Sequence, residues 1–280
     1  NCVHLEETHE IIKLIRDVYD AIAPGMILLS ETNVPHQENI SYWGEDGDEA
    51  QKIYNFSLAP LVLFSLETGT ATRLTEWAGT LKPLHDRTVI LNITATHDGI
   101  GMRPTEGILT AAERRLLTDL AERHGGRVSY KTNPDGTETP YELNLTYFDA
   151  INNPNDPSLE KDEQVKRFVC AQGIPMALIG IPGIYIHSLL GSRNDYLGRE
   201  ETGQSRSINR EKLAIEGLEE ELADPDSLRA QVMQGVLTLL EIRQAQPAFH
   251  PNAHQAVLSV ERNVFAVLRA SKALDGQRIL

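Results

Sequence analysis

Residues 88–101 read TVILNITATHDGIG, and this stretch decides the fold class. The apolar, β-branched run from residue 89 to residue 93 has the length and composition of a buried parallel strand. It is followed by polar side chains, among them His97 and Asp98. A buried strand with polar groups at its carboxyl end is typical of an α/β protein, in which functional groups gather at that end of the sheet.

The same order of strand and helix recurs along the chain. Apolar runs predict strands at residues 26–30, 53–58, 88–96 and 184–190. Helical spacing predicts helices at residues 8–22, 59–66, 72–81, 110–124, 158–172, 210–223 and 226–245. Thr8 is a candidate N-cap for the first of them, and Thr110 with Glu113 predicts a capping box for the fourth. This alternation predicts a (β/α) barrel. No strand precedes the first helix, so we expect part of the barrel to lie upstream of these residues.

Two regions depart from the alternation. Residues 127–132 and 137–143 flank the turn sequence Asn133-Pro134-Asp135-Gly136, which predicts an inserted hairpin region at about 126–157. Residues 256–260 and 264–269 predict an antiparallel pair. We therefore expect barrel elements over residues 1–245 and the start of a small antiparallel β domain over residues 246–280.

Composition excludes several classes of function. The net charge is −14, without a Lys/Arg-rich block, so we expect no nucleic-acid partner. The only cysteines are Cys2 and Cys170, which indicates neither a disulfide framework nor a cysteine-rich metal site. With no membrane-length apolar run and no charged-then-apolar leader, we expect a cytoplasmic protein that does not enter a membrane.

Four segments in order carry a family resemblance. They are ATHDGIGMRP at residues 95–104, SETNVPH at 30–36, YNFSLAPLV at 54–62 and RSINR at 206–210. They resemble the sucrose-phosphorylase-like α-glucoside phosphorylases of the α-amylase superfamily, and the ETNVPH wording resembles the glucosylglycerate type. The resemblance implies that the chain is the C-terminal half of a (β/α)8 TIM barrel, strands 5 to 8.

The resemblance also implies roles for single residues. Glu31 would be the general acid/base, and Asp98 would stabilise the transition state. His97 would hold the same glucosyl unit, and Arg210 would meet its non-reducing end. Taken singly and without the motif, each of these residue types is more often a capping, loop or surface residue.

Arg193, Asn194 and Asp195 fall where the family has its acceptor-site loop, although a solvated loop is an equal alternative. Extra arginines, Arg193 and Arg199, would suit an anionic acceptor. No metal or organic cofactor is expected, because His97 and Asp98 lack an evident third ligand. Inorganic phosphate would be the co-substrate.

One family feature is missing from these residues. The nucleophilic aspartate, in an Arg-x-Asp-Ala context, has no counterpart before Glu31, and Asp195 is followed by Tyr196. We therefore expect the chain alone to be inactive. The complete enzyme would release α-glucose 1-phosphate from a glucosylglycerate- or sucrose-type glucoside by retaining phosphorolysis. The alternatives are an α-glucoside hydrolase or transglucosidase on the same fold, or a non-catalytic carbohydrate-binding or regulatory module.

Overall fold

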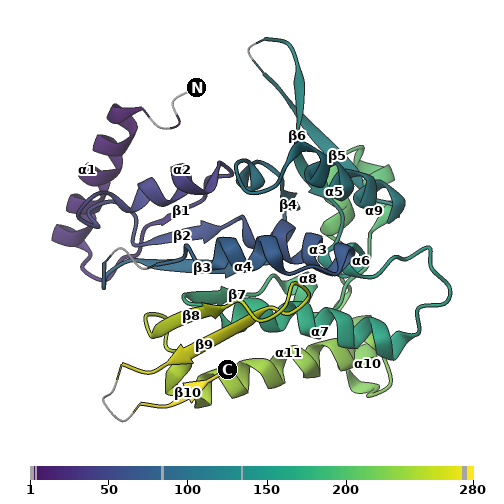
Figure 1. The fold of residues 1–280 in the computed structure, drawn as a ribbon. Coiled ribbons are helices and arrows are strands. Elements are labelled where there is room, and N and C mark those ends of the chain that lie inside the picture. Colours follow the sequence, from purple (N-terminus) through teal and green to yellow (C-terminus); the bar gives the residue numbers. More distant parts are fainter. Residues whose placement is uncertain (1–2, 4, 83–84, 134, 273–275) are drawn as a thin grey trace.

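A four-stranded parallel sheet organises the molecule (Figure 1). The computed structural model describes residues 3, 5–82, 85–133, 135–272 and 276–280. The strands are β1 (Leu29–Ser30), β2 (Lys52–Asn55), β3 (Val89–Ile93) and β7 (Ile181–Gly183), which pair in the order β1-β2-β3-β7. All three pairings are parallel. The predicted α/β class with a parallel sheet is confirmed.

Helices precede and follow each of these strands. They are α1 (Glu6–Ile22), α2 (His36–Ile40), α3 (Leu58–Thr68), α4 (Thr72–Ala78), α5 (Ala111–Arg123), α6 (Tyr147–Ile151), α7 (Lys161–Ala177), α8 (Ile186–Leu189), α9 (Tyr196–Thr202), α10 (Ile215–Ala223) and α11 (Leu228–Ala245). Short 3-10 helices lie at η1 (Ser41–Trp43), η2 (Arg103–Thr105), η3 (Ser205–Asn209) and η4 (Pro247–Phe249). None of the helices in the described ranges is long and apolar enough to cross a bilayer.

The fourth strand lies earlier than predicted. Residues 184–190 do not form a strand; they contain α8, and the strand is β7. Gly180 allows the chain to approach β3 here, because its φ is +110° and an added Cβ would lie 2.4 Å from the carbonyl oxygen of Ile90. Pro182 lies inside this strand, where it pairs with Asn92 in the ladder.

The core surrounds the first two turns of α3, which are apolar on all sides. Leu58, Leu61, Val62 and Leu63 are almost completely buried, as expected of a helix enclosed by its neighbours. This helix packs against β3, α5 and α7. Helix α3 therefore covers one face of the parallel sheet at β3.

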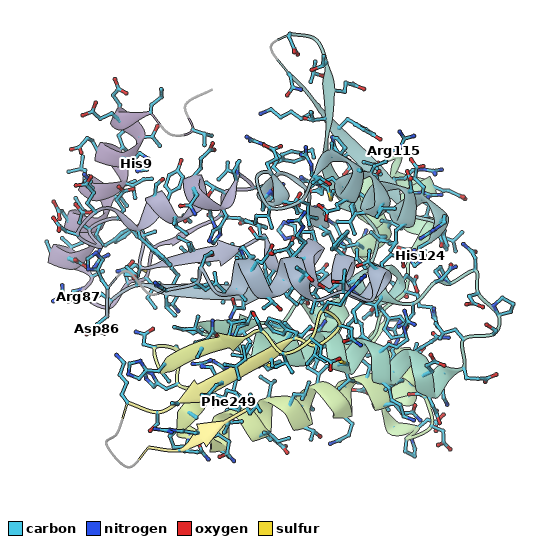
Figure 2. All side chains as sticks on the ribbon, in the orientation of Figure 1. His9, Asp86, Arg87, Arg115, His124 and Phe249 are labelled. Atoms are coloured by element: carbon cyan, nitrogen blue, oxygen red, sulfur yellow. The ribbon has the colours of Figure 1, made fainter. Side chains whose placement is uncertain are left out.

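Local signals also set the ends of α5. The predicted capping box is present, since Thr110 Oγ1 accepts from the Glu113 backbone N–H at 3.2 Å and Glu113 accepts from the Thr110 N–H at 2.7 Å. At the other end, buried His124 lies with its Nδ1 2.8 Å from the carbonyl oxygen of Asp149 (Figure 2). By contrast, Thr8 is not an N-cap, because α1 begins before it.

Two antiparallel sheets complete the fold. Strands β5 (Arg127–Thr132) and β6 (Glu138–Asn144) form the predicted hairpin, which projects beyond the helices (Figure 1). Pro134 of its turn lies outside the described residues, as does Cys2, whereas Cys170 is an exposed free thiol. Strand β4 (Ile100–Gly101) pairs with β6 and joins the hairpin to the region that follows β3.

The last sheet contains β8 (His254–Leu258), β9 (Ala266–Ala270) and β10 (Arg278–Ile279). Strands β8 and β9 form the predicted antiparallel pair. The buried Arg269 guanidinium donates to the Ala177 carbonyl at 2.8 Å, and the Gln255 side chain accepts from the Ile179 N–H at 2.7 Å. These bonds fix the C-terminal sheet against the segment that joins α7 to β7.

Candidate active site

The carboxyl ends of β1 and β3 deliver the candidate catalytic carboxylates. Glu31 directly follows β1, and Asp98 follows β3 after a short polar segment. Parallel strands end at the same edge of a sheet, so both groups reach one face. A cavity of about 380 Å³ lies there, lined by Glu31, His97, Asp98 and Arg210 among others. The structure thus brings four of the predicted site residues together.

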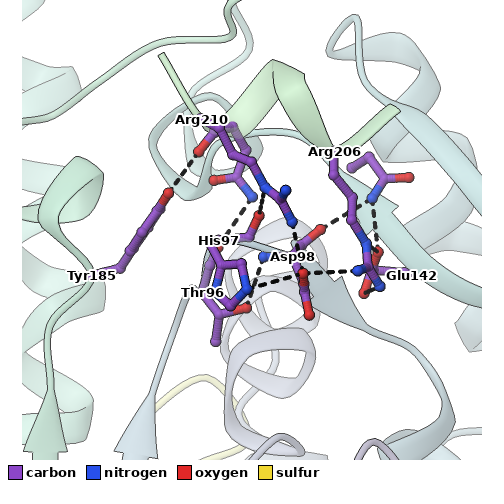
Figure 3. Close-up of polar contacts among 9 residues, drawn as sticks. Thr96, His97, Asp98, Glu142, Tyr185, Arg206 and Arg210 are labelled. Atoms are coloured by element: carbon purple, nitrogen blue, oxygen red, sulfur yellow. Dashed lines mark hydrogen bonds and ion pairs between the residues drawn. The ribbon is translucent and has the colours of Figure 1, made fainter. Parts of the chain in front are cut away.

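Asp98 is held by cations on one of its two oxygens (Figure 3). Arg206 and Arg210 each place a guanidinium nitrogen 2.9 Å from Oδ1, and His97 Nε2 lies 3.4 Å from the same atom. No described side chain donates a hydrogen bond to Oδ2. The carboxylate is therefore fixed in orientation while one oxygen stays available to a ligand.

The backbone around Asp98 is fixed as well. Its N–H donates to Thr96 Oγ1 at 3.1 Å, and the Asn209 amide donates to the Thr96 carbonyl at 3.1 Å. Arg210 Nε donates to the His97 carbonyl at 2.6 Å. The Tyr185 hydroxyl donates to the Asn209 carbonyl at 2.9 Å. Residues that follow β7 thus position the residues that follow β3.

Gly99 allows the hairpin to reach the site. Its φ is +129°, and an added Cβ would lie 2.5 Å from the carbonyl oxygen of Leu143. Directly after it, Ile100 pairs with Leu143 and Gly101 pairs with Glu142. This register places the Glu142 carboxylate in the cavity.

Glu142 and Arg206 form an ion pair that the sequence reasoning did not identify. Arg206 Nε and a terminal nitrogen donate to the two Glu142 oxygens at 2.9 and 3.2 Å, and the Asn144 amide donates at 3.0 Å. Burial raises the pKa of Glu142, and the bonds from Arg206 oppose that rise. Because the same guanidinium also contacts Asp98, Arg206 joins the two carboxylates.

Comparisons with known proteins show which proteins this chain is similar to. The chain is 50% identical over 258 residues to a glucosylglycerate phosphorylase of Allomeiothermus silvanus, covering 92% of this chain and 46% of the relative. It is 40% identical over 271 residues to the glucosylglycerate phosphorylase of Escherichia coli, covering 97% and 48%. The chain is a homologue of glucosylglycerate phosphorylases. It spans about half the length of these relatives.

The fold of this chain also matches that of a solved enzyme. Sucrose 6F-phosphate phosphorylase from Thermoanaerobacter thermosaccharolyticum superposes with a TM-score of 0.76 at 22% identity, over 95% of this chain and 49% of that one. No protein-family model matches the chain.

The structure of this chain does not place the predicted acceptor-loop residues beside Glu31. Arg193, Asn194 and Asp195 line a different cavity, of about 580 Å³, which shares no lining residue with the cavity that contains Glu31. Their polar atoms are used within the fold: Arg193 pairs with buried Asp149 at 2.9 Å, Asn194 accepts from the Thr146 N–H at 2.8 Å, and Asp195 caps α9.

No metal site is evident in the described part of this chain. No three His, Cys, Asp or Glu side chains there are placed to hold one ion.

Proposed function

We propose that the protein containing these residues is a retaining α-glucoside phosphorylase of the glucosylglycerate type, which releases α-glucose 1-phosphate and a free acceptor. The observation that carries the proposal is the cavity that Glu31 lines together with a cation-bound Asp98. Homology to glucosylglycerate phosphorylases supports the substrate class. In this proposal β1, β2, β3 and β7 are strands 5 to 8 of a (β/α)8 barrel, and residues 246–280 begin a separate β domain.

Asp98 is the proposed transition-state stabiliser. Arg206 and Arg210 hold Oδ1, so Oδ2 can accept a hydrogen bond from a ring hydroxyl of the glucosyl unit. A fixed negative charge favours the positive charge that develops at the anomeric carbon. His97 and Arg210 line the same cavity and would donate to other hydroxyls of the sugar.

Glu31 is the proposed general acid/base. Its side chain is exposed and has no described ion-pair or hydrogen-bond partner, which leaves its proton free to move to the leaving oxygen. A nucleophilic carboxylate from outside these 280 residues would attack the anomeric carbon and form a β-glucosyl enzyme. Phosphate would then attack in turn, with overall retention. We propose that the 280-residue chain alone is inactive.

Product analysis tests this proposal. The full-length protein, supplied with α-glucosylglycerate and inorganic phosphate, should form glucose 1-phosphate, and the 280 residues alone should form none. Free glucose as the main product would identify a hydrolase, and transfer to a sugar would identify a transglucosidase. Binding of the glucoside without turnover would favour a non-catalytic module.

A further inference from the structure

A second cavity adjoins the first at Glu31. It measures about 790 Å³ and shares Glu31, Asn33 and Tyr141 with the cavity that contains Asp98. Asn33 packs against Gly101, where an added Cβ would lie 2.7 Å from its Oδ1. Glu31 therefore lines both spaces, the one that contains Asp98 and the one that adjoins it.

This position fits the geometry of a general acid. A proton donor lies beside the bond that breaks, with the glucosyl unit on one side and the leaving group on the other. Since the Asp98 cavity suits the glucosyl unit, the second cavity is the space for the acceptor. This inference rests on the proposed function.

The charges in the second cavity are mostly positive. Its lining includes Arg103 and Lys131, and Glu31 is its one carboxylate among the described residues. Neither cation has an ion pair or side-chain hydrogen bond with a described residue, in contrast to Arg206 and Arg210. Two half-buried cations that no described side chain pairs with form a receptor for an anion.

Both cations are carried by ordered backbone. Arg103 begins η2, and the Pro104 carbonyl beside it accepts from buried Ser57 Oγ at 3.0 Å. Lys131 lies on β5 of the hairpin. The arginines expected for this role are engaged elsewhere, because Arg193 pairs with Asp149 and the Arg199 guanidinium lies 5.5 Å from the centre of the Tyr196 ring.

We propose that Arg103, assisted by Lys131, binds the oxyanion of the molecule that occupies this cavity. That oxyanion is the carboxylate of a hydroxy-acid acceptor such as glycerate, or the phosphate that takes the acceptor's place in the second step. A planar guanidinium can donate to two oxygens of either group at once. Arg103 is thus a specificity-determining residue for anionic over neutral acceptors.

Two glucosides that differ in one charge provide the test. Full-length wild type, Arg103→Gln and Lys131→Gln are assayed with glucosylglycerate and with neutral glucosylglycerol. Arg103→Gln should lower kcat/KM for glucosylglycerate by roughly 10- to 100-fold and change that for glucosylglycerol by less than about 3-fold. Lys131→Gln should show the same selectivity with a smaller loss. Arg115→Gln, an exposed arginine on α5 outside both cavities (Figure 2), is the matched control and should change neither value.

The phosphate dependence separates the two sources of the oxyanion. If Arg103 serves phosphate, the KM for phosphate rises about equally with both glucosides. If it serves the acceptor carboxylate, the KM for phosphate stays constant and inhibition by glycerate weakens. Unchanged discrimination together with an unchanged KM for phosphate in Arg103→Gln would overturn the proposal.

A binding measurement keeps this proposal separate from the proposed function. Calorimetric titration of glycerate into wild type and Arg103→Gln needs no turnover. Loss of glycerate binding in the variant would support the anion site even if no glucose 1-phosphate is formed. Equal binding of glycerate together with an unchanged KM for phosphate, in an active phosphorylase, would refute the site and leave the function standing.

Discussion

Removal of the Arg206 guanidinium should reveal how strongly this group couples the carboxylates of Asp98 and Glu142. The substitution Arg206→Met keeps most of the apolar stem and deletes the contacts to Asp98 at 2.9 Å and to Glu142 at 2.9 and 3.2 Å. Asp98 keeps Arg210 and His97. Glu142 keeps only the Asn144 amide among its described partners.

The expected cost comes mainly from Glu142. Its side chain is 4% exposed, so an ionised carboxylate left there is poorly solvated. Hydrogen bonds to a charged group contribute about 1.5–3 kcal/mol, but the Arg206 side chain is 41% exposed and solvent screens part of this. We expect Arg206→Met to lower the free energy of unfolding by roughly 2 kcal/mol near pH 7.

The sign of the pH dependence follows from the direction of the pKa shift. Burial already raises the pKa of Glu142, and loss of Arg206 removes the interaction that opposes this rise. A carboxyl group with a raised pKa in the folded state destabilises the protein as pH rises above its unfolded pKa, because the unfolded state ionises first. The difference between wild type and Arg206→Met should therefore grow from about pH 4.5 upward.

A double-mutant cycle measures the coupling energy between Arg206 and Glu142. Urea unfolding of full-length wild type, Arg206→Met, Glu142→Gln and the double variant gives the coupling energy at each pH. Glu142→Gln removes the charge and keeps an amide that can accept from Asn144, so the double variant should recover about half of the loss. An Arg206→Met cost that is independent of pH, or that Glu142→Gln does not relieve, would refute the reasoning.

Three further outcomes are expected. Glu31→Gln should reduce glucose 1-phosphate formation by about 10²- to 10⁴-fold without lowering stability, checked by initial rates and thermal unfolding side by side. Thr110→Ala should cost about 0.5–2 kcal/mol of unfolding free energy, whereas Thr110→Ser should retain most of it, because only the serine keeps the cap. Burial lowers the pKa of His36, so the unfolded state takes up its proton first and stability falls as pH drops below about 6.5. His36→Gln should make that fall shallower by up to about 1.4 kcal/mol per pH unit in urea titrations, and an unchanged slope would contradict the assignment.

The sequence predicted features that depend on local order. The apolar run before His97 and Asp98 formed β3, and the Thr110 capping box formed as written, because strand burial and helix caps are decided within a few residues. The prediction of a strand at residues 184–190 was wrong for a local reason too. The apolar run at residues 184–190 contains α8, whereas the strand before it includes Pro182 and Gly183, residue types that are depleted in strands.

Features that depend on distant pairing were missed. Glu142 reaches the site because it pairs with Gly101 in the β4–β6 ladder. These two residues are 41 positions apart in the sequence, so no local spacing rule predicts their contact. Arg206 lies within a motif recognised for Arg210, and the sequence gives no sign of which carboxylates each arginine meets. The partners of Arg193 and Arg103 could not be predicted from the sequence either. Both are arginines near polar loops, and only the fold shows that Arg193 is paired with Asp149 while Arg103 lines the cavity beside Glu31.

The hairpin connects the proposed acceptor cavity with Asp98. Its strand β6 provides Glu142, which holds Arg206 against Asp98, and Tyr141, which lines both cavities. Its strand β5 provides Lys131. Because an added Cβ at Gly99 would lie 2.5 Å from the Leu143 carbonyl, a side chain at this position would displace β6 from the residues that follow β3. Any displacement of this hairpin should therefore alter the orientation of Asp98 and the selectivity for an anionic acceptor together, and a change in one without the other would show that the two cavities act independently.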